Sequence, residues 1–277
     1  MRELAYPFNL FDLNGQVVII TGGLGKLGSQ FAKTLVQANA KVATFDITEK
    51  PNQELEELAR EYPLLFLKVD ITSENSVKKG LIAIEKQWGI PTILINNAGW
   101  KASPNNPQGA GEAFEEYPID LWERVFKVNV TGAAICAKII GKRIIEAEKN
   151  GVIINIVSQY ALVAPDQRIY DYRQKIGKNK FVKDASYGAS KAALVAMTRD
   201  LAIQWAPRGI RVVAVAFGGV LNPASDKEFI ESYSQRVPLG RMANVDEYNG
   251  AILFLASGAA SYMTGTTLVL DGGFTSW

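Results

Sequence analysis

Histidine is absent from this 277-residue sequence. Its absence excludes Ser-His-Asp catalysis, thiolate catalysis by a Cys–His pair and metal sites that depend on imidazole ligands. The sequence has one cysteine, Cys136, and this count excludes an intrachain disulfide and a cysteine-rich metal site. Because Cys136 lies on an apolar helix face, we expect a small buried hydrophobic side chain rather than a nucleophile. No metal site is therefore expected.

An excess of charge of either sign is also missing. The sequence has 30 Lys and Arg against 28 Asp and Glu, and this near balance argues against nucleic acid or an anionic membrane as a partner. No stretch approaches about 18 apolar residues, and the N-terminal segment lacks the unbroken apolar core of a signal peptide. We therefore expect a soluble, cytoplasmic protein that acts on a small molecule.

Apolar, β-branched segments alternate with helical patterns along the whole chain. The predicted strands are 17–21, 41–46, 64–70, 92–96, 152–158, 210–216 and 267–270, and the predicted helices are 27–38, 53–61, 73–88, about 121–149, 185–205 and about 245–256. Strands that are apolar throughout are buried on both faces, and this alternation predicts a parallel sheet with right-handed crossovers. No linker or repeat divides the chain. We predict a single α/β domain over residues 1–277, with a doubly wound parallel sheet of about seven strands and helices on both faces.

A glycine-rich turn, Thr21-Gly22-Gly23-Leu24-Gly25-Lys26-Leu27-Gly28, joins the first predicted strand to the first predicted helix. Glycines permit a tight turn and let backbone N–H groups approach a pyrophosphate at the helix N-terminus. This placement, directly after a strand and before a helix, predicts a dinucleotide site.

Two carboxylates follow neighbouring predicted strands. Asp46 ends the second strand, where it would accept hydrogen bonds from ribose hydroxyls and repel a 2′-phosphate, so the sequence favours NAD over NADP. Lys26 and Lys41 offer the opposite interpretation, because their charges could attract a 2′-phosphate. Asp70 ends the third strand, where it contacts an adenine or simply begins the turn Asp70-Ile71-Thr72.

Tyr187 and Lys191 lie four residues apart in the predicted helix 185–205, so they occupy the same helix face. A neighbouring ammonium favours phenolate, and we therefore expect Lys191 to lower the pKa of Tyr187 towards the working pH. Such a pair can act as a general acid and base. Most pairs with this spacing are only solvated helix faces, so the interpretation depends on the other motifs.

The order of the motifs resembles that of the short-chain dehydrogenase/reductase family along nearly the whole chain. The matching positions are the glycine turn, Asp46, Asp70, Asn96-Asn97-Ala98-Gly99, Asn129, Ser158, Tyr187, Lys191, Gly265 and Asp271-Gly272-Gly273. The resemblance implies a Rossmann-type fold of the compact, single-domain branch. It also implies an NAD(P)-dependent enzyme that interconverts a secondary alcohol and a ketone by hydride transfer.

The resemblance also implies a role for each matching residue. Tyr187 is the general acid and base, Ser158 hydrogen-bonds the substrate oxygen, Lys191 holds the nicotinamide ribose, and Asn129 anchors a water of a proton relay. The implied cofactor-binding residues are Gly22, Leu24, Gly25, Lys26, Leu27, Gly28, Asp46, Asp70, Ile71, Asn97, Ala98, Gly99, Tyr187, Lys191, Gly218, Val220 and Asn222. The candidate substrate residues are Trp100, Ser158, Tyr160, Arg168, Tyr170 and Phe217. A homo-oligomer, either a tetramer or a dimer, is expected, with contacts through the helix that carries Cys136 and through residues 262–267.

The glycine spacing departs from the compact branch. It reads TGxxGxxG, which is typical of the extended branch, and this favours a nucleotide-sugar epimerase or dehydratase with tightly held NAD as a second hypothesis. A non-enzymatic NAD-binding scaffold is the third. The NNAG stretch, the short chain and the C-terminal motif favour the compact branch, and the intact set Asn129, Ser158, Tyr187 and Lys191 argues against a scaffold.

Ser158 and Tyr187 are separated by more residues than in most family members, and the excess is the segment 165–184. This insertion holds six Lys and Arg residues against three Asp residues; the basic ones are Arg168, Arg173, Lys175, Lys178, Lys180 and Lys183. It is interpreted either as a basic lid for a carboxylate, phosphate or polyhydroxylated substrate, or as a solvated loop or subunit contact. The insertion and the C-terminal tail resemble members linked to bacterial surface-sugar or flagellin-glycan synthesis, which implies a sugar-derived substrate.

Overall fold

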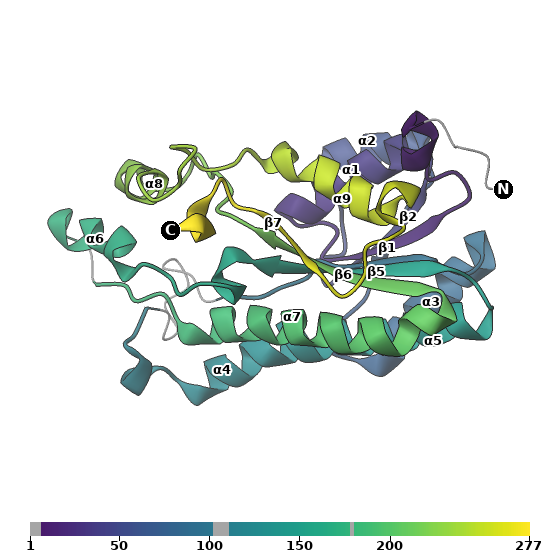
Figure 1. Cartoon of the computed structure of the whole chain (residues 1–277), viewed down its shortest axis with the longest axis horizontal. Coiled ribbons are helices and arrows are strands. Elements are labelled where there is room, and N and C mark those ends of the chain that lie inside the picture. The colour runs from purple at the N-terminus through teal and green to yellow at the C-terminus, as the bar shows by residue number, and fades with distance from the viewer. Residues whose placement is uncertain (1–6, 102–110, 178–179) are drawn as a thin grey trace.

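Seven parallel strands form the centre of the protein, in a computed structural model that describes residues 7–101, 111–177 and 180–277 (Figure 1). The strands are β1 Val17–Thr21, β2 Lys41–Asp46, β3 Leu64–Lys68, β4 Ile93–Asn96, β5 Gly151–Ser158, β6 Ile210–Phe217 and β7 Thr267–Leu270. Their order in the sheet is β3-β2-β1-β4-β5-β6-β7. The chain therefore winds outward from β1 in both directions, which confirms the Rossmann-type doubly wound sheet predicted from the sequence.

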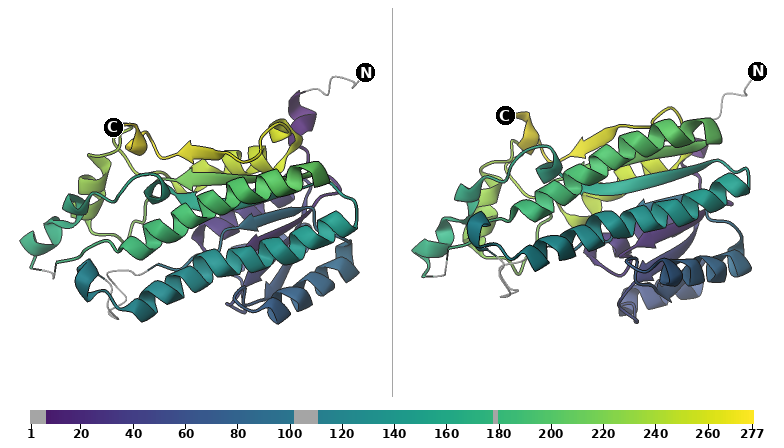
Figure 2. Two further views of the ribbon diagram at one scale, coloured as in Figure 1. Left: turned by 60° about the horizontal axis from the view of Figure 1, so that its bottom comes forward. Right: turned by 90° about the horizontal axis from the view of Figure 1, so that it is seen from below.

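Helices cover both faces of this sheet. They are α1 Lys26–Gln37, α2 Gln53–Glu61, α3 Glu74–Trp88, α4 Ile119–Phe126, α5 Ala133–Glu146, α6 Tyr172–Lys175, α7 Ala185–Trp205, α8 Lys227–Ser234 and α9 Asn249–Ala256. Figure 1 shows α1, α2 and α9 on one face and α5 and α7 on the other. In Figure 2, α7 runs beside the long α4–α5 helix. Within the described ranges no helix is long and apolar enough to cross a membrane.

The sequence of β1 explains why the core has two layers. Alternate residues of a strand point to opposite faces, so Val18 and Ile20 pack towards α1 and α9, whereas Val17 and Ile19 pack towards α3 and α5. All five residues of the strand are buried, and each large aliphatic side chain so buried contributes about 1.5–3 kcal/mol. Cys136 lies in the second layer, where burial raises the pKa of its thiol to about 12 and confirms it as a core residue.

The predicted helix 121–149 is interrupted. α4 is followed by a π-helical segment, Lys127–Gly132, and only then by α5. A π-helical turn adds one residue to the helical repeat, and such turns occur frequently at functional sites. The segment contains the buried Asn129, so the difference from the prediction lies at one of the candidate catalytic residues.

A smaller cluster lies beyond the carboxyl ends of the strands, where α6 and α8 extend past the sheet (Figure 1). Ile169 of the insertion packs there with Tyr233 of α8, and Tyr172 donates a hydrogen bond to Asp226 at 2.9 Å. Arg236 binds Asp166 with Nε 2.5 Å from Oδ2. These contacts hold the described part of the insertion against α8, an element that the sequence patterns did not predict.

Candidate active site

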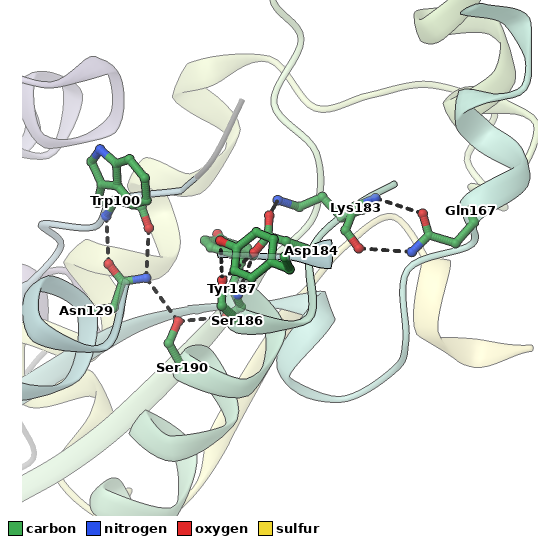
Figure 3. Close-up of polar contacts among 9 residues, drawn as sticks. Trp100, Asn129, Gln167, Lys183, Asp184, Ser186, Tyr187 and Ser190 are labelled. Atoms are coloured by element: carbon green, nitrogen blue, oxygen red, sulfur yellow. Dashed lines mark hydrogen bonds and ion pairs between the residues drawn. The ribbon is translucent and has the colours of Figure 1, made fainter. Parts of the chain in front are cut away.

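The candidate residues gather at one edge of the sheet because parallel strands end on the same side. The glycine turn follows β1, Asp46 ends β2, the NNAG stretch follows β4, and Ser158 ends β5. Tyr187 lies in the first turn of α7, where Figure 3 places it beside the residues around Asn129. Residues that are far apart in the sequence thus line a single edge.

The glycine turn has the close backbone contacts that a dinucleotide cradle requires. Gly22 has a φ of +62°, and a Cβ at this position would lie 2.8 Å from the Cα of Ala98. A Cβ on Gly28 would collide with the backbone oxygen of Gly22. Asn97 donates hydrogen bonds from Nδ2 to the oxygens of Thr21 and Gly22, each at 3.0 Å. The turn and the start of α1 therefore fit a bound pyrophosphate.

The two predicted strand-end carboxylates have different partners. Asp46 accepts hydrogen bonds from the backbone N–H groups of Leu24 and Thr48, each at 3.0 Å, which places its carboxylate beside the glycine turn. Asp70 is exposed and accepts from both the backbone N–H and the hydroxyl of Thr72 at 2.8 Å, so it begins a turn. Ile71 is 6% exposed and packs against Gly132. Of Asp46, Asp70 and Ile71, only Asp46 lies directly against the glycine turn.

Ser158, Tyr187 and Lys191 come together although the insertion separates the first from the others. The Ser158 hydroxyl lies close enough to the Tyr187 phenol to oppose the rise in its pKa. Lys191 donates from Nζ to the backbone oxygen of Ile156 at 2.8 Å, and its Nζ lies 6.0 Å from the centre of the Tyr187 ring. The same-face arrangement predicted for Tyr187 and Lys191 is therefore confirmed.

Asn129 completes this group from the π-helical segment. Its Oδ1 accepts from the backbone N–H of Trp100 at 2.6 Å, and its Nδ2 donates to the Trp100 oxygen and to Ser190 Oγ, both at 3.0 Å (Figure 3). Arg124 stacks on the Trp100 ring, with its Cζ 4.6 Å from the ring centre. Asn129 thus ties the segment after β4 to α7.

The electrostatics of Tyr187 differ from the prediction. Burial raises the pKa of Tyr187 above its usual value, and the Ser158 hydroxyl opposes this rise without cancelling it. Burial also lowers the pKa of Lys191 to about 8, and the charge of Lys101 adds to this shift. The expected lowering of the Tyr187 pKa is therefore not found, because the loss of hydration and the charge of Asp184 outweigh the effect of Ser158.

The segment after β6 lies across from the glycine turn. Val220 pairs with Ala243, and the backbone N–H of Gly218 donates to Leu270 at 2.9 Å. Lys26, the first residue of α1, donates from Nζ to the backbone oxygen of Leu221 at 2.6 Å. Asn222 is exposed and accepts a hydrogen bond from Ala224. The lysine that replaces a glycine in the turn therefore links the two sides of the dinucleotide site.

Three of the candidate substrate residues, all aromatic, divide into two groups. Tyr160 packs edge-on against Phe274, and Tyr170 lies 4.9 Å from Phe181 between ring centres, so both tyrosines pack against the cluster that contains Tyr233. Burial raises the pKa of each phenol. Phe217 instead stacks on Tyr248 in the core, with ring centres 4.1 Å apart.

Arg168 also lies away from the residues around Tyr187. Its side chain is 77% exposed and pairs with Asp166, with Nε 2.9 Å from Oδ1. The candidate roles of Phe217 and Arg168 therefore do not agree with their positions, because the first side chain faces the sheet interior and the second faces solvent. Among the other predicted basic residues of the insertion, Lys178 lies outside the described residues.

The sequence patterns missed the role of the last two residues of the insertion. Asp184 caps α7 by accepting from the backbone N–H of Tyr187 at 3.0 Å and from the Ser186 hydroxyl at 2.5 Å. Lys183 binds Asp184 at 3.1 Å and is 8% exposed. Burial alone would raise the pKa of Asp184, but Lys183 and these hydrogen bonds lower it overall, which favours the carboxylate form of Asp184. Lys183, Tyr187 and Lys191 follow one another at intervals of four residues, and this regular spacing is the sequence signal that could have identified Lys183.

Comparison with known proteins defines the class. A family model described as enoyl-(acyl carrier protein) reductase matches residues 25–275. An NAD-dependent glycerol dehydrogenase of Listeria innocua is 30% identical over 272 residues, which cover 96% of both chains. A galactitol 2-dehydrogenase of Rhizobium johnstonii is 32% identical, with 96% of this chain and 98% of the relative covered. The crystal structure of a gluconate 5-dehydrogenase from Burkholderia cenocepacia in complex with NADP and tartrate has a TM-score of 0.82 at 27% identity, covering 98% of this chain and 100% of that chain.

The chain belongs to the short-chain dehydrogenase/reductase family. It is an NAD(P)-dependent oxidoreductase of that family, as its relatives are named dehydrogenases and reductases.

Proposed function

We propose that this enzyme prefers NAD and interconverts a secondary alcohol and a ketone on a sugar-derived, polyhydroxylated substrate. The observation that carries the proposal is the meeting of Ser158, Tyr187, Lys191 and Asn129 beside the glycine turn. The named activities of relatives that act on glycerol, threitol and galactitol support the substrate class. Asp46, with its carboxylate against the turn, supports the preference for NAD.

Each residue of the group has a separate task in this proposal. When bound, the nicotinamide accepts or donates the hydride. The Tyr187 phenol donates its proton to the substrate oxygen during reduction, its phenolate takes the hydroxyl proton during oxidation, and Ser158 donates a hydrogen bond to the substrate oxygen. Lys191 supplies positive charge beside the phenol, and Asn129 holds the backbone at Trp100 in register with α7.

Replacement of the catalytic phenol tests the proposal directly. We expect Tyr187→Phe to lower kcat for polyol oxidation about 1,000-fold, within the range known for loss of a general base. Binding of NADH, measured by fluorescence titration, should remain within about twofold because the phenol oxygen is not part of the glycine cradle. Full activity in this variant would refute the role of Tyr187. Tighter binding of NADPH than of NADH to the wild-type enzyme would refute the role of Asp46.

The epimerase and dehydratase hypothesis rests on the glycine spacing alone. The structure offers another reason for that spacing, because Lys26 turns out of the cradle and contacts Leu221. Stoichiometric formation of NADH during substrate turnover distinguishes the hypotheses: the dehydrogenase accumulates NADH, whereas an epimerase regenerates its bound NAD.

We also propose a homo-oligomer whose contact covers a groove between α5 and α7. This groove has a volume of about 450 Å³ and is lined by apolar side chains that include Ile145, Leu201 and Trp205. A second copy of the chain would cover these side chains, and light scattering on the purified protein should give at least twice the mass of one chain.

A further inference from the structure

Lys183 is buried next to the catalytic phenol although no step of the proposed reaction uses it. Its side chain is 8% exposed, and its Nζ lies 4.8 Å from the centre of the Tyr187 ring. Lysine is among the residues least often buried, because removal of the ammonium from water is costly unless a partner compensates. The position of this ammonium therefore needs an explanation.

The backbone of Lys183 is fixed independently of its ammonium. Gln167 accepts a hydrogen bond from the Lys183 backbone N–H at 2.8 Å and donates one to the Lys183 oxygen at 3.0 Å (Figure 3). Asp184 caps α7 in the next position. The charge of Lys183 is therefore not needed to hold the insertion against the start of α7.

Asp184 accepts only one of the hydrogen bonds that the Lys183 ammonium can donate. An ammonium has three N–H donors, and Asp184 Oδ2 accepts one of them at 3.1 Å. The remaining donors belong to a nitrogen that lies 4.8 Å from the centre of the Tyr187 ring. A substrate held by Ser158 and Tyr187 would lie within reach of them.

The charges around Tyr187 do not balance. Lys191 lies on one side of the phenol, and Lys101 interacts electrostatically with Lys191, Lys183 and Asp184. Lys26 lies on the pyrophosphate side of the site. Once Asp184 is paired with Lys183, the charge of Lys101 has no opposite charge among these groups. A substrate that carries an anionic group would neutralise this surplus.

We infer that Lys183, assisted by Lys101, binds a carboxylate on the polyhydroxylated substrate, so that the enzyme acts on a sugar acid rather than on a neutral sugar alcohol. The inference rests on the proposed function and adds the substrate class to it. Lys183 is a specificity-determining residue in this account: it positions the substrate carboxylate and takes no part in the proton transfer to Tyr187. An ammonium–carboxylate hydrogen bond gains strength in a partly desolvated site.

Matched substrates that differ in one group provide the test. D-Gluconate and D-glucitol, and likewise D-galactonate and D-galactitol, share the hydroxyl pattern of carbons 2 to 6 and differ by a carboxylate against a hydroxymethyl group at C1. We expect the wild-type enzyme to prefer the acid of each pair. In Lys183→Met, kcat/KM for the acid should fall about 10- to 100-fold, mainly through KM, as expected for loss of a charged hydrogen bond. The value for the alcohol should stay within about threefold.

Two further variants control for charge and shape. Lys183→Arg keeps the charge and should recover most of the affinity for the acid. Lys227→Met removes an exposed lysine at the start of α8 and should leave kcat/KM for both substrates unchanged.

If Lys183→Met does not fold, the wild-type enzyme still provides a test through tartrate binding to its NADH complex, followed by fluorescence. Binding that weakens as NaCl rises supports the inference, and no tartrate binding overturns it.

The possible failures are distinguishable. A wild-type enzyme that oxidises the alcohols better than the acids overturns the inference and leaves the proposed dehydrogenase intact. An equal loss of kcat on both substrates in Lys183→Met also overturns it, because Lys183 would then act by positioning Tyr187. Failure of the wild-type enzyme to bind NADH or to oxidise any of the four compounds would instead refute the proposed function.

Discussion

The cofactor-binding region and the substrate end of the same sheet edge are held together in different ways. At the glycine turn, the contacts are between backbones, or between Asn97 and backbone oxygens, over a small set of residues. At the substrate end, side chains pair across long separations, as in Asp166 with Arg236 and Tyr172 with Asp226. The first arrangement requires small residues at fixed positions, whereas the second tolerates new residues that find a partner elsewhere in the chain.

The largest effect is expected at the glycine turn. A Cβ on Gly28 would meet the backbone of Gly22, and it would lie 2.7 Å from the Cα of Gly23, so Gly28→Ala must displace the turn. We expect the affinity for NADH to fall at least about 100-fold, measured by fluorescence titration, because the pyrophosphate loses its backbone donors. Gly250→Ala is the matched control, since no atom lies within 4 Å of a Cβ there. Equal affinity in both variants would show that the turn is not the cofactor site.

A second, pH-dependent effect is expected where the two regions meet at Lys191. The pKa of this lysine is about 8 in the folded protein and about 10.5 when it is exposed, so the unfolded chain binds more protons between these values. The free energy of unfolding therefore rises with pH across this window, by up to about 3 kcal/mol. Urea unfolding of the wild-type protein and of Lys191→Met at pH 7.5 and 10 isolates this contribution. A difference between the two proteins that does not change with pH would contradict the shift.

The smallest of the three effects is expected at the substrate end. Arg236→Met removes the ion pair with Asp166, in which both side chains are partly buried at 26% and 20% exposure. We expect a loss of about 1 kcal/mol in the free energy of unfolding by urea, and a rise in KM for the alcohol with no change in NADH affinity. Arg168→Met should cost less stability, because its side chain is 77% exposed. A loss of NADH affinity in Arg236→Met would show that the two regions are coupled.

The comparison also explains which features could be predicted from the sequence. Local patterns were sufficient for the sheet and for the glycine turn, because β-branched runs and glycine spacing act over a few residues. The pairing of Tyr187 with Lys191 needed only the helical repeat. By contrast, α8 and the cluster around Tyr233 depend on contacts with the insertion, which no local pattern reveals.

The electrostatic prediction failed for a related reason. The sequence shows that an ammonium lies four residues from Tyr187, but it does not show how much water the phenol loses. Burial decides the direction of the pKa shift at Tyr187 and at Lys191. The positions of Phe217 and Arg168 could not be predicted either, because a residue next to a motif can face the core or the solvent.

Because the π-helical segment contains Asn129, the number of residues between α4 and α5 affects the candidate active site. An α-helix turns by about 100° per residue, so deletion of one residue between Lys127 and Gly132 would rotate α4 by that angle relative to α5. Leu121 and Val125 are buried on α4, and they would turn away from their neighbours at the same time as Asn129 left Trp100. Single-residue insertions and deletions here would therefore be tolerated far less than substitutions, so the number of residues in this segment constrains its variation as strongly as their identity.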